Sequence, residues 1–232
     1  MDNLFDDLYE SEEYYEDISL AMDYIFSANV TGSSLTKKVC DLVGAFRKEQ
    51  SVVTFTFSGG EILNTADLMK ADRDMTDAQI EFESQYSGIM AQIDVYKITG
   101  HEYEITMMMP HEELKATEKR EEIILLIAKK FFTYLNPEYG VTGEQVFARP
   151  TDEITDDEFV GAFEEIGFIG GHQYKMRELI NRSISKFDVT PLSGGELFVR
   201  RDFMKEVEKI ERKHGDKKKK GLFSRLFDKD DE

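Results

Sequence analysis

The clearest alternation of hydrophobic and polar positions lies between residues 90 and 109. Residues 90–99 and 102–109 alternate apolar with polar side chains, and the first stretch is rich in β-branched residues, so two strands are predicted. Gly100 and His101 form a short turn between them. Pro110 ends the second strand because it has no N–H to donate to a neighbouring strand. The pattern predicts a β-hairpin.

A helix is predicted soon after this hairpin. A short acidic link leads to Thr117, whose hydroxyl can cap the helix. Asn136-Pro137 ends it, because the residue before proline is excluded from the helical region. Between these limits, apolar residues recur at helical spacing and predict one buried face: Ile123, Ile124, Ile127, Phe131, Tyr134 and Leu135. Hairpin and helix form a ββα unit around which the rest of the chain is organised.

The segment before the hairpin is predicted to contain two helices and a strand. Residues 12–26 are dense in apolar side chains, which indicates a helix docked on the core. Ser33 or Ser34 caps a second helix that runs to about Gln50, with these residues inward: Leu35, Val39, Leu42, Val43 and Phe46. Residues 51–57 form a strand and 58–61 a turn. Residues 80–90 fit both a helix and a strand, and the spacing does not decide between them.

Four more elements are predicted after the central helix. Residues 139–147 form a strand, and Thr155, followed by acidic residues, begins a helix that buries Phe159, Phe163 and Ile166. A further helix follows Gly170-Gly171 and carries Met176, Leu179, Ile180 and Ile184. Residues 186–192 and 196–200 flank Ser193-Gly194-Gly195 as a closing hairpin.

This order of elements predicts an α+β fold, with a mainly antiparallel sheet built from hairpins, helices packed on it and a charged C-terminal tail. Three segments are expected. Residues 1–11 are an acidic flexible start, residues 12–202 a single α+β domain, and residues 203–232 a charged helix followed by a polybasic amphipathic tail.

Composition supports a folded, acidic protein. The chain has 232 residues, of which 41% are hydrophobic, and a net charge of −18. Such a surface repels nucleic acid, so no nucleic-acid partner is expected. The single cysteine, Cys40, excludes an internal disulfide and fits a reducing compartment. With an acidic start in place of a signal peptide and no long apolar run, the sequence predicts a cytoplasmic protein, with peripheral membrane attachment as an option.

Residues 192–196 read Leu-Ser-Gly-Gly-Glu and match the signature pentapeptide of ABC-transporter ATPases. In that family the motif opens a helix, whereas here the strand-like residues Leu197, Phe198 and Val199 follow it. The chain also lacks a phosphate-binding Gly-x-x-x-x-Gly-Lys-Ser/Thr loop. The pentapeptide is therefore interpreted as a hairpin turn.

No catalytic residue, metal site or cofactor is predicted. Asp72, Asp74, Thr76 and Glu83 have the spacing of a calcium loop, but Asp77 stands where glycine is needed, which favours a solvated acidic loop. The four histidines form no metal-ligand pair, and His111 is expected in a solvent-facing lead-in to a helix. Cys40 is expected to be a buried small hydrophobic residue rather than a nucleophile. The protein is therefore not expected to be an enzyme.

The C-terminal tail carries the strongest functional signal. Residues 209–227 hold eight cations against two anions, a net charge of +6. The cations include Lys217, Lys218, Lys219 and Lys220, and the side of the following short helix carries Leu222, Phe223, Leu226 and Phe227. A basic run beside an apolar patch suits reversible binding to an anionic membrane surface. A peptide that docks in a protein groove and a tail without function are the open alternatives.

The N-terminal segment contains a second candidate docking motif. Leu4, Phe5, Leu8 and Tyr9 share one helical face among acidic neighbours, which is typical of a short partner-binding helix. The alternative is the frayed start of an ordinary acidic helix.

These features lead to two functional hypotheses. The first is a non-enzymatic cytoplasmic interaction or adaptor protein, with an acidic globular domain and a tail that docks on a membrane surface or a protein partner. The second rests on layout: a helix that ends in Asn-Pro-Glu-Tyr-Gly, then helices and a Gly-Gly hairpin, resembles immunity proteins that neutralise toxins in bacterial competition. That resemblance implies an inhibitor of a basic toxin or effector. It carries no diagnostic motif and assigns no site residue.

Overall fold

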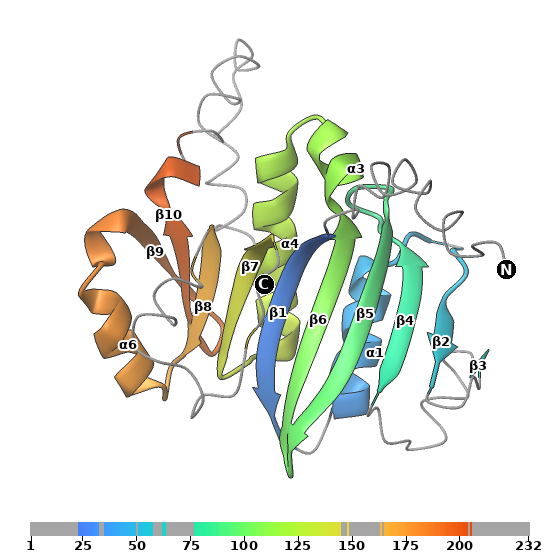
Figure 1. Ribbon diagram of the computed structural model, residues 1–232, viewed down its shortest axis with the longest axis horizontal. Coiled ribbons are helices and arrows are strands. Elements are labelled where there is room, and N and C mark those ends of the chain that lie inside the picture. The colour runs from blue at the N-terminus through green and yellow to red at the C-terminus, as the bar shows by residue number, and fades with distance from the viewer. Residues whose placement is uncertain are drawn as a thin grey trace, which may run out of the picture.

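The computed structural model in Figure 1 describes residues 23–205 except 33–34, 50, 58–61, 64–76, 145–147, 149–162, 164 and 204. The elements in chain order are β1 (Asp23–Thr31), α1 (Leu35–Phe46), β2 (Thr54–Thr56), β3 (Ile62–Leu63), β4 (Ala78–Glu83), β5 (Met90–Thr99), β6 (Glu102–Pro110), α3 (His111–Ala116), α4 (Arg120–Leu135), β7 (Tyr139–Glu144), β8 (Ile166–Gly170), α6 (Tyr174–Asn181), η3 (Ile184–Lys186), β9 (Phe187–Leu192) and β10 (Gly195–Arg200).

Within the described residues the strands form one ten-stranded sheet in the order β3-β2-β4-β5-β6-β1-β7-β8-β10-β9. Every strand pair is antiparallel. The predicted α+β class with an antiparallel sheet is confirmed. The predicted hairpins over residues 90–109 and 186–200 are confirmed as β5–β6 and β9–β10.

Strand β1 occupies the middle of the sheet, between β6 and β7. The helix predicted over residues 12–26 is therefore wrong for Asp23–Phe26, and residues 12–22 lie outside the described residues. Every β1 residue from Tyr24 to Val30 is buried, because both faces of the strand are covered. A strand buried on both faces loses part of its polar alternation, and its apolar density then resembles that of a buried helix.

Helices α1 and α4 cover one face of the sheet, behind the strands in Figure 1. The predicted inward residues of α1 are all buried: Leu35, Val39, Leu42, Val43 and Phe46. In α4, Ile124, Ile127, Phe131 and Leu135 are buried as predicted, whereas Ile123 is only partly buried and Tyr134 is 41% exposed. We call this helix-covered side the core face.

The opposite side, which we call the outer face, is covered differently in its two halves. Over β7, β8 and β10 lies a second hydrophobic cluster to which α6 contributes Met176 and Ile180. Its sheet residues include Tyr139, Val141 and Phe198. Over β4, β5 and β6 no described helix lies on the outer face, as Figure 1 shows. We call this part of the outer face the β4–β6 half.

One predicted helix start, Thr117, and one predicted helical residue, Ile166, are wrong. Thr117 follows α3 as its C-terminal cap, and α4 begins at Arg120 after Lys119, whose φ is 66°. The acidic link is itself helical because Pro110 begins α3 as its N-cap and acidic residues fill the first turn. The second error is Ile166, which begins β8 instead of lying on the buried face of a helix. Residues 155–162, where that helix was predicted to begin, lie outside the described residues.

Residues 78–83 form strand β4, with Ala78, Ile80 and Phe82 buried, so the first part of the ambiguous stretch is a strand and residues 84–89 form the connection to β5. The Leu-Ser-Gly-Gly-Glu motif forms the β9–β10 turn as predicted. At Gly194 φ is +81°, and a Cβ there would meet Asn136 Oδ1 at 1.7 Å, so only glycine fits this turn.

Gly140 in β7 lies close against Phe132 of α4. A Cβ at Gly140 would lie 2.2 Å from Phe132 Cε1 and 2.9 Å from the Ser27 carbonyl oxygen. Phe132 is fully buried and stacks on Phe168, so it has little room to move. We expect Gly140→Ala to lower the free energy of unfolding by about 1–3 kcal/mol, as overpacked cores do.

Urea unfolding followed by circular dichroism measures this effect. Gly44→Ala is the matched control, because Gly44 lies in α1 and a Cβ there would meet nothing within 4 Å. Alanine favours a helix over glycine by roughly 0.5–1 kcal/mol, so this control raises stability. Equal unfolding midpoints for Gly140→Ala and wild type would contradict the close packing of β7 on α4.

Candidate functional site

The β4–β6 half of the outer face and the adjacent strand β1 carry a row of acidic and polar side chains. Strands β4, β5, β6 and β1 alternate, so their core-facing apolar residues leave every second side chain on the outer face. The register places Asp94 beside Thr106, Tyr96 beside Glu104, and Glu81 beside Gln92. We call the following set the acidic face: Glu81, Gln92, Asp94, Tyr96, Glu102, Glu104, Thr106, Ser27 and Asn29.

Asp94 is held in place by neutral donors. Gln92 Nε2 donates to its two carboxylate oxygens at 3.0 and 3.1 Å, and the Tyr96 hydroxyl donates at 3.0 Å. Burial and this hydrogen bond raise the pKa of Tyr96 to about 12, so the phenol stays a donor at neutral pH. Asp94 is 7% exposed, and its position is therefore fixed before any ligand arrives.

Glu102 and Glu104 also accept hydrogen bonds from neutral side chains of β1. Asn29 Nδ2 donates to Glu102 at 2.6 Å, and Ser27 Oγ donates to Glu104 at 2.8 Å. Thr99 Oγ1 adds a donor to Glu102 at 3.2 Å. Among the described residues, no cation forms an ion pair with Asp94 or Glu102.

Carboxylates elsewhere in the described part of the chain are commonly paired with cations. The pairs include Lys48 with Glu83, Lys119 with Glu122, Arg177 with Glu196, Arg200 with Asp202 and Arg201 with Asp188. Within the described residues, the negative charge of Asp94 and Glu102 has no such compensation. The acidic face therefore carries a local negative potential that can attract a cationic group.

Two buried oxygen atoms on the acidic face have no hydrogen-bond partner. They are Thr106 Oγ1 and Asn29 Oδ1, on side chains that are 1% and 0% exposed. A buried polar atom without a partner costs about 1–3 kcal/mol, and both oxygens can accept hydrogen bonds. A ligand that brings N–H donors and positive charge matches these oxygens and the neighbouring carboxylates.

Two exposed side chains with large apolar parts lie in and beside the acidic face. Tyr96 is 46% exposed, and Met90, at the start of β5 on the same side of the sheet, is 53% exposed. Tyrosine and methionine are enriched at protein interfaces, where charged residues surround them. The combination fits a protein surface better than a small ion.

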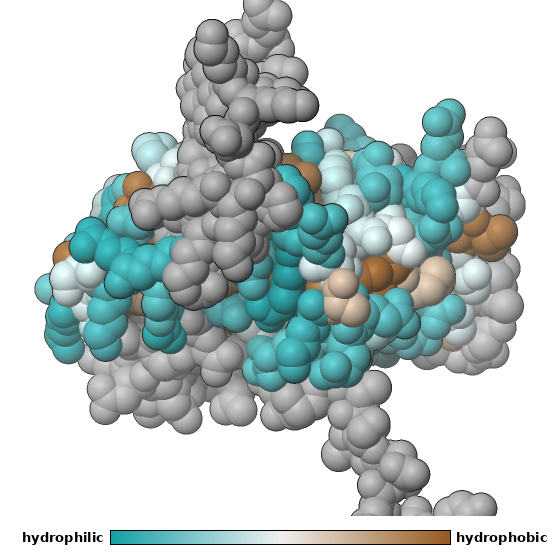
Figure 2. All heavy atoms as spheres, turned by 90° about the horizontal axis from the view of Figure 1, so that it is seen from above, coloured by the Kyte–Doolittle hydropathy of each residue, from teal (hydrophilic) through white to brown (hydrophobic). Residues whose placement is uncertain are grey.

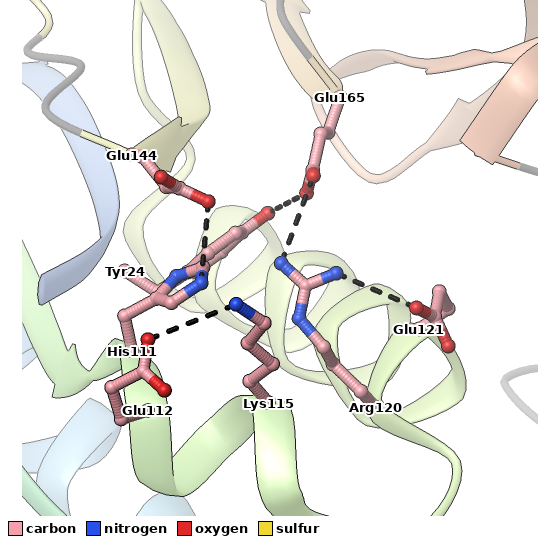
Figure 3. A network of polar contacts seen from close by, with 8 residues as sticks. All are labelled: Tyr24, His111, Glu112, Lys115, Arg120, Glu121, Glu144 and Glu165. Carbon is pink, nitrogen blue, oxygen red and sulfur yellow. Dashed lines mark hydrogen bonds and ion pairs between the residues drawn. The ribbon is translucent and has the colours of Figure 1, made fainter. Parts of the chain in front are cut away.

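A second candidate lies on the core-face side, at the end of the sheet where α3 and α4 meet. Figure 3 shows the network of polar contacts at this place. A hollow of about 530 Å³ lies beside it. The hollow is lined by His111, Lys115, Thr117, Lys119, Arg120, Glu121, Glu144 and Glu165. Figure 2 views the molecule from above, and the described surface there is mostly hydrophilic with small apolar spots.

His111 corrects a sequence prediction, because it is 7% exposed and does not face solvent. Pro110 starts α3 at the end of β6, and His111 is thereby placed against the end of β7. His111 Nε2 lies 3.3 Å from Glu144 Oε1, whereas Nδ1 is buried without a partner. Burial of a lead-in residue depends on tertiary packing, which the sequence pattern does not reveal.

Tyr24, Glu165 and Arg120 form the other half of the network. The Tyr24 hydroxyl donates to Glu165 and lies 3.1 Å from Thr142 Oγ1. Burial raises the pKa of Glu165 above its usual value, although the Tyr24 hydrogen bond and Arg120 act to lower it. Arg120 lies over the Tyr24 ring at 5.5 Å. Burial and the adjacent Glu165 carboxylate raise the pKa of Tyr24 well above 10.0.

Charges around this hollow largely balance one another. Lys115, Lys119 and Arg120 face Glu121, Glu144 and Glu165, and the ion pairs of Arg120 with Glu121 and Glu165 measure 3.4 and 3.8 Å. The contacts join α3 and α4 to β1, β7 and the start of β8. We therefore interpret the network as one that holds these elements together.

Of the other candidate residues from the sequence, Cys40 and Glu83 lie in the described part of the chain and the rest lie outside it. Cys40 is buried, as expected, and burial raises the pKa of its thiol to about 11, which suppresses the nucleophilic thiolate. Glu83, the last position of the calcium-like spacing, pairs with Lys48. The remaining candidates lie outside the described residues: Asp72, Asp74 and Thr76, Leu4, Phe5, Leu8 and Tyr9, Lys217–Lys220, and Leu222, Phe223, Leu226 and Phe227.

Neither metal binding nor membrane spanning has support in the described residues. They contain no group of three or more His, Cys, Asp or Glu side chains placed to hold a metal ion. Within the same residues, none of the helices is both long and apolar enough to cross a membrane.

Comparison with known proteins does not assign a family. No protein-family model matches the chain, and no curated protein matches it in sequence. Among solved structures, the Pseudomonas aeruginosa T6SS protein PA0821 matches with 9% identity and a TM-score of 0.49, over 77% of this chain and 68% of that chain. At this level of similarity no function can be transferred.

Glu165→Gln tests the buried network through its pH dependence. Because the pKa of Glu165 is raised in the folded state, its contribution to stability is present below the unfolded pKa of about 4.3 and is lost as pH rises through the folded pKa. Glutamine stays neutral, so the stability of the variant relative to wild type should be higher at pH 7 than at pH 4.

Urea unfolding at the two pH values measures the difference. Glu178→Gln, on the exposed side of α6, serves as the control and should show the same relative stability at both. If the stability of Glu165→Gln relative to wild type is instead lower at pH 7 than at pH 4, the buried carboxyl is favoured in its ionised form and the prediction is contradicted.

Proposed function

We propose that the protein is a non-enzymatic cytoplasmic interaction protein that binds a basic protein partner through the acidic face. The observation that carries the proposal is the set of fixed carboxylates whose donors are neutral, with Asp94 and Glu102 as its clearest members. A lysine or arginine from a partner supplies both the missing charge and the missing donors. Nucleic acid is excluded as a ligand of this face because its phosphates are repelled.

Preorganisation supports a partner of protein size. Gln92 and Tyr96 already fix Asp94, so binding does not require ordering of that carboxylate. Tyr96 and Met90 add exposed apolar area beside it. A buried charge with an aromatic neighbour is a common arrangement at the energetic centre of protein interfaces.

The more specific candidate is an immunity-type inhibitor that neutralises a basic toxin or effector. The same rigid, uncompensated carboxylates favour it, because an inhibitor must bind tightly to a cationic surface without rearrangement. The C-terminal residues Lys217–Lys220 and Leu222, Phe223, Leu226 and Phe227 are proposed as a second docking segment.

A charge-neutral variant of the acidic face tests the proposed function. Glu81→Gln, Asp94→Asn and Glu102→Gln together remove three negative charges and keep side-chain size. In affinity capture from the native cell extract, we expect the amount of basic partner bound by this triple variant to be at least about tenfold lower than with wild type. Truncating a buried charge pair costs about 2–5 kcal/mol. Quantitative mass spectrometry of captured proteins is the measurement.

The matched control removes three charges elsewhere. Asp41→Asn, Glu113→Gln and Glu178→Gln are exposed substitutions outside the acidic face and keep the same net charge as the triple variant. The control should capture the same basic proteins as wild type. If both triple variants capture them equally, or if the captured proteins are acidic, the acidic face is not the binding surface.

A further inference from the structure

The acidic face has a potential ligand within the same chain. The segment 209–227 has a net charge of +6 in a protein whose total is −18. Its lysines offer ammonium groups, each with three N–H donors. On the acidic face, Asp94 and Glu102 have no described cation, and Thr106 Oγ1 and Asn29 Oδ1 have no hydrogen-bond partner. Charge and donor count are therefore complementary.

The chain is long enough to connect the two. Described residues end at Lys205, just after β10, and β10 is four strand spacings from β6, which carries Glu102, and five from β5, which carries Asp94. At about 4.8 Å per spacing, these separations are roughly 19 and 24 Å. The dozen residues that lead from Lys205 to Lys217 span at most about 40 Å when extended. Lys217–Lys220 can thus reach the strands that carry Asp94 and Glu102.

We propose that the basic segment 209–220 binds the acidic face of its own chain and is displaced when a basic partner binds. The proposal rests on the proposed function, because both require the acidic face to recognise cations. It adds an occupant and a form of regulation. The tethered segment competes with the partner, so the apparent partner affinity reflects how well the partner displaces it.

The size of this competition follows from tethering. A flexible tether holds its ligand at an effective concentration on the order of 1 mM. If the free segment binds with a dissociation constant of about 10–100 μM, tethering weakens a competing ligand by roughly ten- to hundredfold. Displacement also releases the apolar residues Leu222, Phe223, Leu226 and Phe227, which follow the segment in the sequence.

A fluorescent peptide with the sequence of residues 209–220 tests the proposal on full-length chains. Its binding is measured by anisotropy at low salt to wild type and to a tail variant with Lys217–Lys220 replaced by glutamine. The peptide should bind the tail variant at least tenfold more tightly than wild type. Adding Glu81→Gln, Asp94→Asn and Glu102→Gln to the tail variant should abolish binding, whereas adding Asp41→Asn, Glu113→Gln and Glu178→Gln should not.

Three outcomes would overturn the proposal. Equal binding to wild type and tail variant means that the tail does not occupy the face. Binding to neither means that the segment is not a ligand, and the partner capture described above then decides separately whether the face has another one. The third outcome concerns anionic liposomes. If wild type and the triple variant at Glu81, Asp94 and Glu102 sediment with them to the same extent, the membrane binds the tail instead of the acidic face.

The tail could also bind the acidic face of a second copy of the chain, and this alternative predicts a dimer. Light scattering of wild type over a dilution series measures it. A constant monomer mass supports binding within one chain, whereas a concentration-dependent dimer that dissociates in the tail variant would overturn it in favour of binding between chains.

Discussion

The pairing of β1 with both β6 and β7 is the interaction on which the rest of the structure depends. β1 joins the two halves of the sheet, and its residues from Tyr24 to Val30 are buried. Its core-facing side packs against α4, while Ser27 and Asn29 on the other side donate to Glu104 and Glu102. One strand therefore stabilises the hydrophobic core and fixes the carboxylates of the acidic face.

This dual role explains why the two faces of the sheet differ. The core face buries aromatic and aliphatic side chains under α1 and α4, and among the described helices α6 packs on the outer face over β7, β8 and β10. The β4–β6 half has carboxylates oriented by neutral donors, which fixes their positions without cancelling their charge. Such an arrangement suits recognition of a cation better than stabilisation of the fold, since an ion pair within the chain would serve stability equally well.

The sequence predicted the elements whose periodicity is local. Residues 90–110 alternate, contain a turn and end at a proline, and α1 has apolar residues at regular helical spacing. The pattern of the sequence therefore predicted both elements. β1 was missed because burial on both faces conceals its alternation, and Ile166 because glycines and apolar residues in β8 carry no clear period. Asp94 and Glu102 occupy polar positions of the predicted strands. Which side chains they lie beside depends on strand register, and the sequence pattern does not give that register. His111 was misjudged because its burial comes from packing between α3 and β7.

Carbodiimide cross-linking with mass spectrometry tests the central claim, that the acidic face recognises cationic groups. The full chain is treated alone and with an added oligolysine peptide, and each new amide bond is assigned to its carboxylate. The account predicts that bonds to lysines of the peptide, or of the chain's own tail, concentrate on Glu81, Glu102 and Glu104. Bonds spread evenly over exposed carboxylates such as Asp41, Glu113 and Glu178 would contradict it.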